Sequence, residues 1–433
     1  MNIRWITCAL GGLVVACSGG TTSVETPVNR APTIEFTYTK LAAVKNTNTD
    51  LSVAVTDADG DPLTVSWTPT RGTLTAQNPQ KTVMRWAVPA TVGTDSVTVT
   101  VSDGKVTRKI TEVIRVGTQV TTTRALFDKA GSPYIVVLDA GNPVFGIDAG
   151  NTTEFDPGVD FYMDTPGSVI DVGGRLLAHG LADQPVVFRP NRRLQCGDDR
   201  GWWVGIHGFT QAGDSVSGEI VLDHTEIRHA QYGVRASNAS TAILRDCAVR
   251  CSSDAGVYHD GIGRMELRDT EVSNGLVHGI LIGGNVSTAI PDSILIDGCM
   301  VAFNEASGIY MNLNDQVQEV GIVVQRTAIE YNFVHGITLG RAVFPVIHRN
   351  RFRSNGVGSG TVSNIYLETG YPNGVTYPTL DATCNYWGAV VGSRSTIDLT
   401  IRDSLDAASV GTRVNVEPWL DQDPLTVTGL ICP

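Results

Sequence analysis

Short runs in which apolar and polar residues alternate with a period of two extend along most of this chain, a pattern typical of half-buried β-strands. Between residues 31 and 117 the runs include IEFTYT, LSVAVTD, LTVSWTPT and DSVTVTVSDG, with turn residues between them. So many short strands in so short a segment indicate a small β-sandwich. Trp67 and Trp86 are the expected core anchors of this domain.

Residues 118–420 carry an internal repeat. Gly-Val or Gly-Ile recurs at Gly233, Gly256, Gly279, Gly308 and Gly336, with spacings of 23, 23, 29 and 28 residues, and each is accompanied by a second apolar run such as ILRDCAV or VVQRTAI. One such unit cannot bury its apolar face alone, whereas stacked units bury a continuous core. The repeat therefore predicts coils of parallel strands stacked along one axis.

Alignment of the repeats predicts three columns of side chains. One inward column holds Thr225, Cys247, Thr270, Cys299, Thr327 and Asn350, and the apolar column beside it holds Ile227, Val249, Val272, Val301, Ile329 and Phe352. Asn304, Asn332 and Asn355 align in the turn that follows, where stacked amides can satisfy backbone groups and one another.

Both regions resemble known bacterial modules. DADGDPL from Asp57 and VSDGK from Val101 resemble PKD and cadherin-like Ig modules of surface proteins. DVGGRLLAHG from Asp171, DRGWWVGI from Asp199, CNYWG from Cys384 and the repeats resemble right-handed parallel β-helices (PbH1 repeats) of the pectate-lyase superfold. The resemblance implies an all-β chain with an N-terminal Ig-like β-sandwich at 31–117 and a right-handed parallel β-helix at 118–420. Residues 421–433 are then a C-terminal tail.

The N-terminus resembles a bacterial lipoprotein signal. Arg4 is followed by a short apolar run that ends in VVAC at Cys17, too short to cross a bilayer. In that family residues 1–17 contain the signal peptide and lipobox, Cys17 becomes the lipid-modified N-terminus, and residues 18–30 read as a flexible tether. The alternative is an ordinary secretory signal with a chance cysteine. The resemblance implies the cell envelope, with Ser18 favouring the outer membrane, on its periplasmic or cell-surface face, and membrane attachment by the lipid anchor only.

Charge and composition exclude several classes of function. The net charge of −12, with no basic cluster, argues against nucleic acid as a partner. All six lysines precede residue 130, so no lysine is available as a base in the second domain. Asp57, Asp59 and Asp61 offer oxygen ligands to Ca²⁺, with a solvated turn as the alternative. We expect no other cofactor.

Outward positions of the repeats supply candidate site residues. Arg245, Asp246, Arg268 and Asp269 lie on successive coils, where a polysaccharide lyase would need a base and charge stabilisation. The alternative is a ladder of ion pairs between coils. A second outward column contains Arg235, Tyr258, Leu281, Tyr310, Thr338 and Tyr366, in which Tyr258, Tyr310, Tyr366 and Arg235 are candidates for sugar binding or for covering the β face.

The cysteines and the candidate sites lead to two functional hypotheses. Export permits disulfides, and Cys384 with Cys432 is the expected pair, whereas Cys247 and Cys299 lie two coils apart and should stay free. The favoured hypothesis is a non-catalytic, lipid-anchored envelope protein whose β-helix surface binds a polysaccharide or envelope proteins. The alternative is a carbohydrate-active lyase or epimerase that acts on an acidic polysaccharide.

Overall fold

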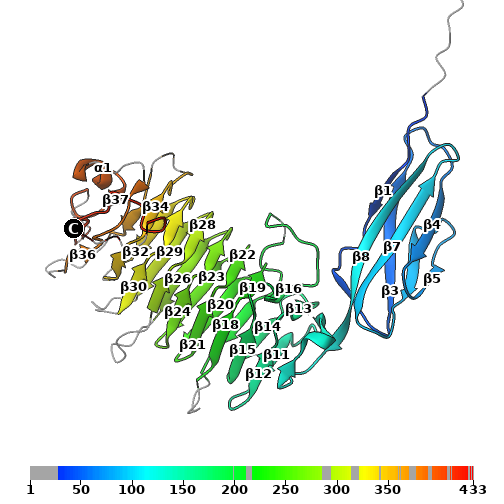
Figure 1. The fold of residues 1–433 in the computed structure, drawn as a ribbon, viewed down its shortest axis with the longest axis horizontal. Coiled ribbons are helices and arrows are strands. Elements are labelled where there is room, and N and C mark those ends of the chain that lie inside the picture. The colour runs from blue at the N-terminus through cyan, green and yellow to red at the C-terminus, as the bar shows by residue number, and fades with distance from the viewer. Residues whose placement is uncertain are drawn as a thin grey trace, which may run out of the picture.

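The computed structural model describes residues 28–197, 199–210, 217–284, 294–313, 321–340, 343–358, 360, 362–369, 377–388, 393–406, 410, 412–427, 430 and 432. An Ig-like sandwich is followed by a right-handed parallel β-helix, and the C-terminal residues lie at the far end of the helix (Figure 1). The predicted all-β architecture is confirmed.

Two sheets of mainly antiparallel strands form the Ig-like domain. The first contains β1 (Thr33–Phe36), β3 (Asn48–Thr56), β6 (Val83–Ala87) and β5 (Thr73–Ala76); the second contains β4 (Thr64–Pro69), β7 (Gly93–Ser102), β8 (Thr107–Val120) and β2 (Ala42–Val44). Trp86 is completely buried between them with Leu51, Val97 and Ile114, and Trp67 is partly buried beside this cluster. Both tryptophans thus contribute to the core.

Each coil of the β-helix adds one strand to each of three parallel sheets, in the order first, second, third. The first sheet contains β10 (Tyr134–Val136), β13 (Asp160–Met163), β16 (Val186–Pro190), β19 (Thr225–Arg228), β22 (Ala248–Arg250), β25 (Glu271–Ser273), β28 (Met300–Ala302), β31 (Ala328–Glu330) and β34 (Arg351–Arg353). The second contains β11 (Val144–Ile147), β14 (Val169–Val172), β17 (Gly205–Gly208), β20 (Tyr232–Asn238), β23 (Ala255–Gly261), β26 (His278–Gly284), β29 (Ser307–Leu313), β32 (His335–Leu339), β35 (Ile365–Leu367) and β37 (Ile401–Arg402). The third contains β9 (Leu126–Phe127), β12 (Thr152–Phe155), β15 (Arg175–His179), β18 (Glu219–Asp223), β21 (Thr241–Arg245), β24 (Met265–Arg268), β27 (Ile294–Asp297), β30 (Ile322–Gln325) and β33 (Val346–His348).

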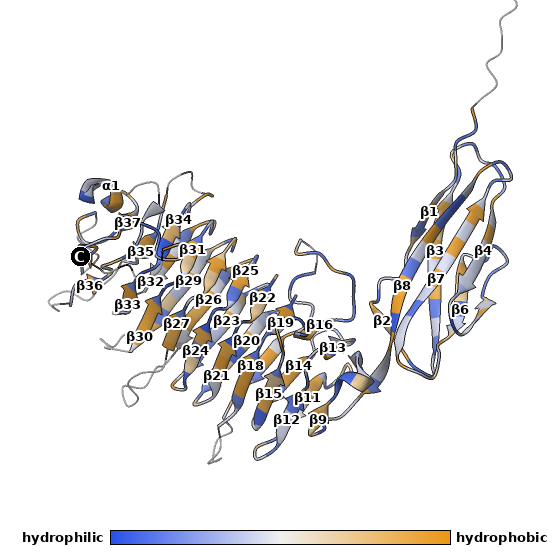
Figure 2. Ribbon diagram, in the orientation of Figure 1, coloured by the Kyte–Doolittle hydropathy of each residue, from blue (hydrophilic) through white to orange (hydrophobic). Residues whose placement is uncertain are grey.

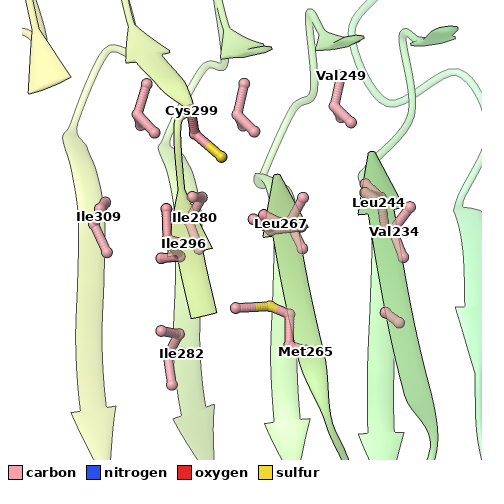
Figure 3. Packing of buried hydrophobic residues seen from close by; sticks show 14 of the residues in the cluster. Val234, Leu244, Val249, Met265, Leu267, Ile280, Ile282, Ile296, Cys299 and Ile309 are labelled. Atoms are coloured by element: carbon pink, nitrogen blue, oxygen red, sulfur yellow. The ribbon is translucent and has the colours of Figure 1, made fainter. Parts of the chain in front are cut away.

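One continuous hydrophobic core fills the β-helix, because every second residue of each strand points inward (Figure 2). Figure 3 shows Leu244, Leu267 and Ile296 of the third sheet stacked on successive coils, with Val234, Ile280 and Ile309 of the second sheet and Cys299 in the same core. The predicted Ile227-to-Phe352 column is confirmed by the strand register. The Asn column is confirmed too: the Asn332 amide donates to Val301 O and Asn355 Oδ1, and its Oδ1 accepts from Asn304.

The bends between sheets use residues with positive φ. Between the third and first sheets these are His224, Asp246, Asp269, Gly298, Arg326 and Arg349, with φ from 42° to 68°. Asp and Asn tolerate this conformation better than most residues with a Cβ. Asp246 and Asp269, two of the predicted catalytic residues, are therefore corner residues of successive coils.

The two domains share a strand. The N-terminal part of β8 pairs with β7 of the sandwich, and Thr118 to Val120 pair with β10 in the first sheet of the β-helix. The boundary expected at 117/118 therefore falls inside a single strand, not in a linker. Contacts beside it include the Asn191 side chain with both backbone groups of Ala42, and Lys40 with Asp164 at 2.7 Å.

Short elements close the β-helix. The 3₁₀ turn η1 (Lys129–Gly131) lies in its first coil. At the far end, β36 (Leu380–Asp381) pairs with β38 (Val414–Asn415), and α1 (Arg394–Asp398) packs near β37. Trp387 stacks on Phe352 at 4.8 Å between ring centroids and covers the last full coil.

Candidate functional site

The outer face of the second sheet brings together the predicted binding residues. Strand register places Arg235, Tyr258, Leu281, Tyr310, Thr338, Tyr366 and Arg402 in one row on β20 to β37. Tyr258, Tyr310 and Tyr366 lie two coils apart, which at about 4.8 Å per rung gives a spacing of about 9.6 Å. We call these residues, with Tyr232, His278 and His335, the aromatic strip.

Each tyrosine of the row has an aromatic partner from the preceding coil. The ring centroids lie 5.4 Å apart for Tyr232 and Tyr258, 4.8 Å for His278 and Tyr310, and 4.2 Å for His335 and Tyr366. All three tyrosines of the row remain half-exposed. Guanidinium groups flank the strip: Arg235 lies 5.0 Å from the Tyr258 ring, and Arg402 lies 4.6 Å from the Tyr366 ring.

Both histidines of the strip are neutral at pH 7. Burial lowers the pKa of His278, and burial together with the charge of Arg402 lowers the pKa of His335 to about 4. The two histidines are the first residues of β26 and β32, and His335 shares a hydrogen bond of 2.6 Å with Ser363 Oγ.

Hydrogen bonds fix part of the strip and leave part of it unpaired. Tyr232 donates to Asp254 at 2.6 Å, and Tyr310 donates to Glu368 at 3.1 Å. The hydroxyls of Tyr258 and Tyr366 have no hydrogen-bond partner among the described residues. Half-exposed rings with free hydroxyls offer both apolar and hydrogen-bonding contacts to a ligand.

The predicted catalytic residues lie elsewhere, along the third sheet and its corner with the first. Arg245 pairs with Asp223 at 3.3 Å. Arg268 pairs with Glu266 and, at 3.1 Å, with Asp297. Asp246 and Asp269 are exposed at the corner. Arg245 and Arg268 therefore form part of an ion-pair ladder between coils, whereas Asp246 and Asp269 have no ion pair among the described residues.

The buried carboxylates of the ladder remain ionised. Burial raises the pKa of Asp297, but the hydrogen bond from Arg326 and the other donors outweigh it, so the pKa lies below its usual value. Burial also raises the pKa of Glu266. The hydrogen bond from Arg268 and the charges of Arg264 and Arg268 outweigh this effect, so the pKa lies below its usual value. A carboxylate that is already paired is a poor general base for a substrate.

The three aspartates of the Ig-like domain lie close together, with carboxylate oxygens of Asp57, Asp59 and Asp61 within 4.8 Å of one another. Asp57 Oδ1 accepts from the backbone N–H groups of the other two, while Asp59 pairs with Arg30 and Asp61 with Lys105. The residues present thus favour the solvated turn, because two of the three carboxylates already have cationic partners.

Two disulfides join described cysteines. Cys384 and Cys432 are bonded, with Cα atoms 5.5 Å apart, and hold the tail to the end of the β-helix. Cys196 and Cys251 form a second bond that sequence analysis missed, because Cys196 lies in a loop outside the repeat. Cys247 and Cys299 are free and buried, and burial raises the pKa of both thiols to about 12. Cys17 lies outside the described residues.

Comparison with known proteins identifies one module. Residues 29–116 match the family model for a bacterial Ig domain, which confirms the predicted Ig-like module. Searches of curated proteins and of solved structures found no significant match. Among the described helices, none has the length and apolar character needed to cross a membrane. Because bacterial Ig domains are typical of extracellular or surface proteins, the match supports an envelope or cell-surface protein.

Proposed function

We propose that this chain is a lipid-anchored protein of the bacterial envelope that binds a neutral glycan along the aromatic strip. The observation that carries the proposal is the row of Tyr258, Tyr310 and Tyr366, half-exposed, each beside a second ring, and about 9.6 Å apart. That spacing is close to the length of two sugar rings in an extended polysaccharide. An extended chain lying along the β-helix axis would therefore meet a tyrosine at every second sugar.

The charges of the strip favour a neutral ligand over an acidic one. Arg235 is paired with Asp260, and Asp254 and Glu368 add negative charge beside the rings. The two histidines add none, since their pKa values are lowered. A polyanion would approach more acidic groups than free cations here, and like charges repel.

We do not propose the lyase alternative, because Arg245 and Arg268 are already engaged with carboxylates. The lipid anchor rests on the VVAC sequence at Cys17, and the pectate-lyase superfold rests on the repeat pattern. Together they suggest a β-helix held at the membrane, with the strip as its binding surface.

A binding experiment tests the proposal. The full chain in mild detergent would be screened by affinity electrophoresis against neutral and acidic polysaccharides. We expect retardation by a neutral glycan, and a loss of affinity of about tenfold or more in Tyr258→Ala/Tyr310→Ala. Tyr331→Ala is the matched control, because Tyr331 stacks on Phe303 at a corner away from the strip. Equal loss in the control, or binding only to protein partners, would contradict glycan binding by the strip.

A further inference from the structure

Asp171, His207 and Ser237 lie next to one another at the N-terminal end of the second sheet's outer face. His207 Nδ1 is 3.1 Å from Asp171 Oδ1, and His207 Nε2 is 3.0 Å from Ser237 Oγ. The 3.1 Å contact is an ion-pair distance, because Asp171 Oδ1 is buried and accepts no hydrogen bond from any described group, and catalytic hydrogen bonds are often poorly aligned before substrate binds. A carboxylate, an imidazole and a hydroxyl in this order are the parts of an activated serine nucleophile. From this geometry we propose that Ser237 is the nucleophile of an ester hydrolase, with His207 as its general base and Asp171 as the residue that positions His207.

The β-helix register produces the arrangement. Asp171 on β14 pairs with His207 on β17, and His207 pairs with Arg235 on β20. Ser237 follows Arg235 by two residues, so both side chains point to the same outer face. The side chains of Asp171 and His207 are 30% and 27% exposed, and Ser237 is 8% exposed. The three residues therefore lie at the surface, and each is largely buried by its neighbours.

Arg235 supplies the fourth component of the proposed site, a hydrogen-bond donor to the negative oxygen that forms during ester hydrolysis. Its guanidinium pairs with Asp260 through Nη2, while its Nε is buried and donates to no acceptor among the described residues. Asp260 Oδ1 is also buried without a partner. Buried polar atoms are rarely left unpaired in folded proteins, so unused donors and acceptors beside a nucleophile point to a bound ligand. Arg235 and Ser237 are two residues apart on β20, so their Cα atoms lie about 7 Å from each other.

These residues account for every step of ester hydrolysis. Ser237 Oγ attacks the ester carbonyl carbon while His207 Nε2 takes its proton, and the N–H groups of Arg235 face the negative oxygen. The tetrahedral intermediate then expels the alcohol, which takes the proton back from His207, and leaves an acyl-serine. Water, deprotonated by His207, attacks the acyl-serine and releases the carboxylic acid and free Ser237.

The expected substrate is a short acyl ester on a sugar hydroxyl, a choice that rests on the proposed glycan binding. Arg235 connects the two features, because its Cζ lies 5.6 Å from the Tyr232 ring and 5.0 Å from the Tyr258 ring at the start of the aromatic strip. A glycan on the strip would therefore bring its acyl groups past Ser237. The ester chemistry itself does not depend on the glycan, and it would replace the expectation of a non-catalytic chain.

The first experiment uses the full chain with p-nitrophenyl acetate and with a fluorophosphonate probe. We expect turnover, and mass spectrometry should locate the probe on Ser237. Ser237→Ala and His207→Gln should each lower kcat/KM by about 10³-fold, and Asp171→Asn should lower kcat by a similar factor with little change in KM. Circular dichroism of each variant would exclude unfolding.

Ser363→Ala provides the matched control. Ser363 bonds to a histidine of the same sheet, His335, at 2.6 Å, and no carboxylate pairs with that histidine among the described residues. The control should keep full activity and labelling. Absence of turnover, labelling elsewhere than Ser237, or equal loss in Ser363→Ala would overturn the proposal.

A second measurement separates the ester chemistry from glycan binding. Ser237→Ala should still bind a neutral glycan in affinity electrophoresis, and the unmodified chain should release acetate from the O-acetylated form of that glycan. Turnover of p-nitrophenyl acetate without glycan binding would refute the glycan as substrate and leave the serine hydrolase. Glycan binding without any turnover or labelling would refute the hydrolase and leave the strip.

Discussion

The outer faces of the second and third sheets use their polar side chains in different ways. On the third sheet and its corner, arginines reach carboxylates of an adjacent coil, as Arg245 does with Asp223 and Arg326 does with Asp297 at 2.7 Å. On the second sheet, rings stack along the axis, and buried polar atoms of Asp171, Arg235 and Asp260 have no hydrogen-bond partner among the described residues.

Every coil offers the same backbone, but the two outer faces differ in role. The third sheet stabilises the fold, and the second sheet is available for recognition. Charges that neutralise one another hold coils in register but leave little for a ligand. Half-exposed rings and unpaired donors remain available for binding. The two faces should therefore respond differently to substitution.

The largest effect is expected in the Asn column, at the buried corner between the first and second sheets. Asn332→Ala removes hydrogen bonds to Val301, Asn304 and Asn355 and leaves their buried groups unpaired. We expect a loss of about 4 kcal/mol in the free energy of unfolding, measured by urea titration. Asn142→Ala, at an exposed turn, should change it by less than about 0.5 kcal/mol. Similar losses in the free energy of unfolding for Asn332→Ala and Asn142→Ala would show that the Asn column does not hold the coils together.

A smaller loss is expected on the third sheet. Asp297→Asn removes the buried charge that pairs with Arg268 and Arg326, and should cost about 2 kcal/mol with no change in glycan affinity. Asp246→Asn is the matched control, because Asp246 is exposed and Asn also tolerates its positive φ of 52°. If Asp246→Asn instead abolished turnover of an acidic polysaccharide, the ladder would be a lyase site after all.

On the second sheet, removal of a ring hydroxyl should change the free energy of unfolding more than the glycan affinity. Tyr310→Phe removes the hydroxyl that donates to Glu368 and should cost about 1 kcal/mol of stability. The ring stacked on His278 remains, so glycan affinity should stay within about threefold. An affinity loss as large as that of Tyr310→Ala would mean that hydrogen bonding by the hydroxyl, not contact with the ring, holds the sugar.

The sequence predicts features that repeat with the coil. The row from Arg235 to Tyr366 and the Asn column could be aligned because one residue type recurs at the coil spacing, and the backbone register follows from burial of the apolar column. The domain boundary expected at 117/118 falls inside a strand, because the change in composition near residue 117 says nothing of the backbone, which continues through β8.

Features that depend on one coil alone stayed hidden. Asp171, His207 and Ser237 are separated by 36 and 30 residues and match no repeat, since the coils at the N-terminal end carry long connections. Only the register of β14, β17 and β20 brings them together. Cys196 escaped prediction for the same reason, as its loop reaches Cys251 two coils later.

The smallest effect, a dependence on pH, should distinguish the two faces within one titration. The folded-state pKa of His335 is about 4, below the 6.5 of the unfolded chain. As pH falls from about 6.5 to 4, the unfolded chain binds a proton that the folded chain does not, so stability declines and then levels off. The pKa of His278 is lowered in the same direction. Asp297 and Glu266 act in the same direction but at lower pH: their pKa values are lowered from the unfolded values of 3.8 and 4.5, so the stability that they add is lost as pH falls through the folded values. The pH dependence of stability should therefore fall into two stages.

Urea titrations between about pH 8 and pH 3 should show both stages. His335→Asn should flatten the upper stage and Asp297→Asn the lower one, whereas a single stage affected equally by both variants would show that the two faces do not act separately.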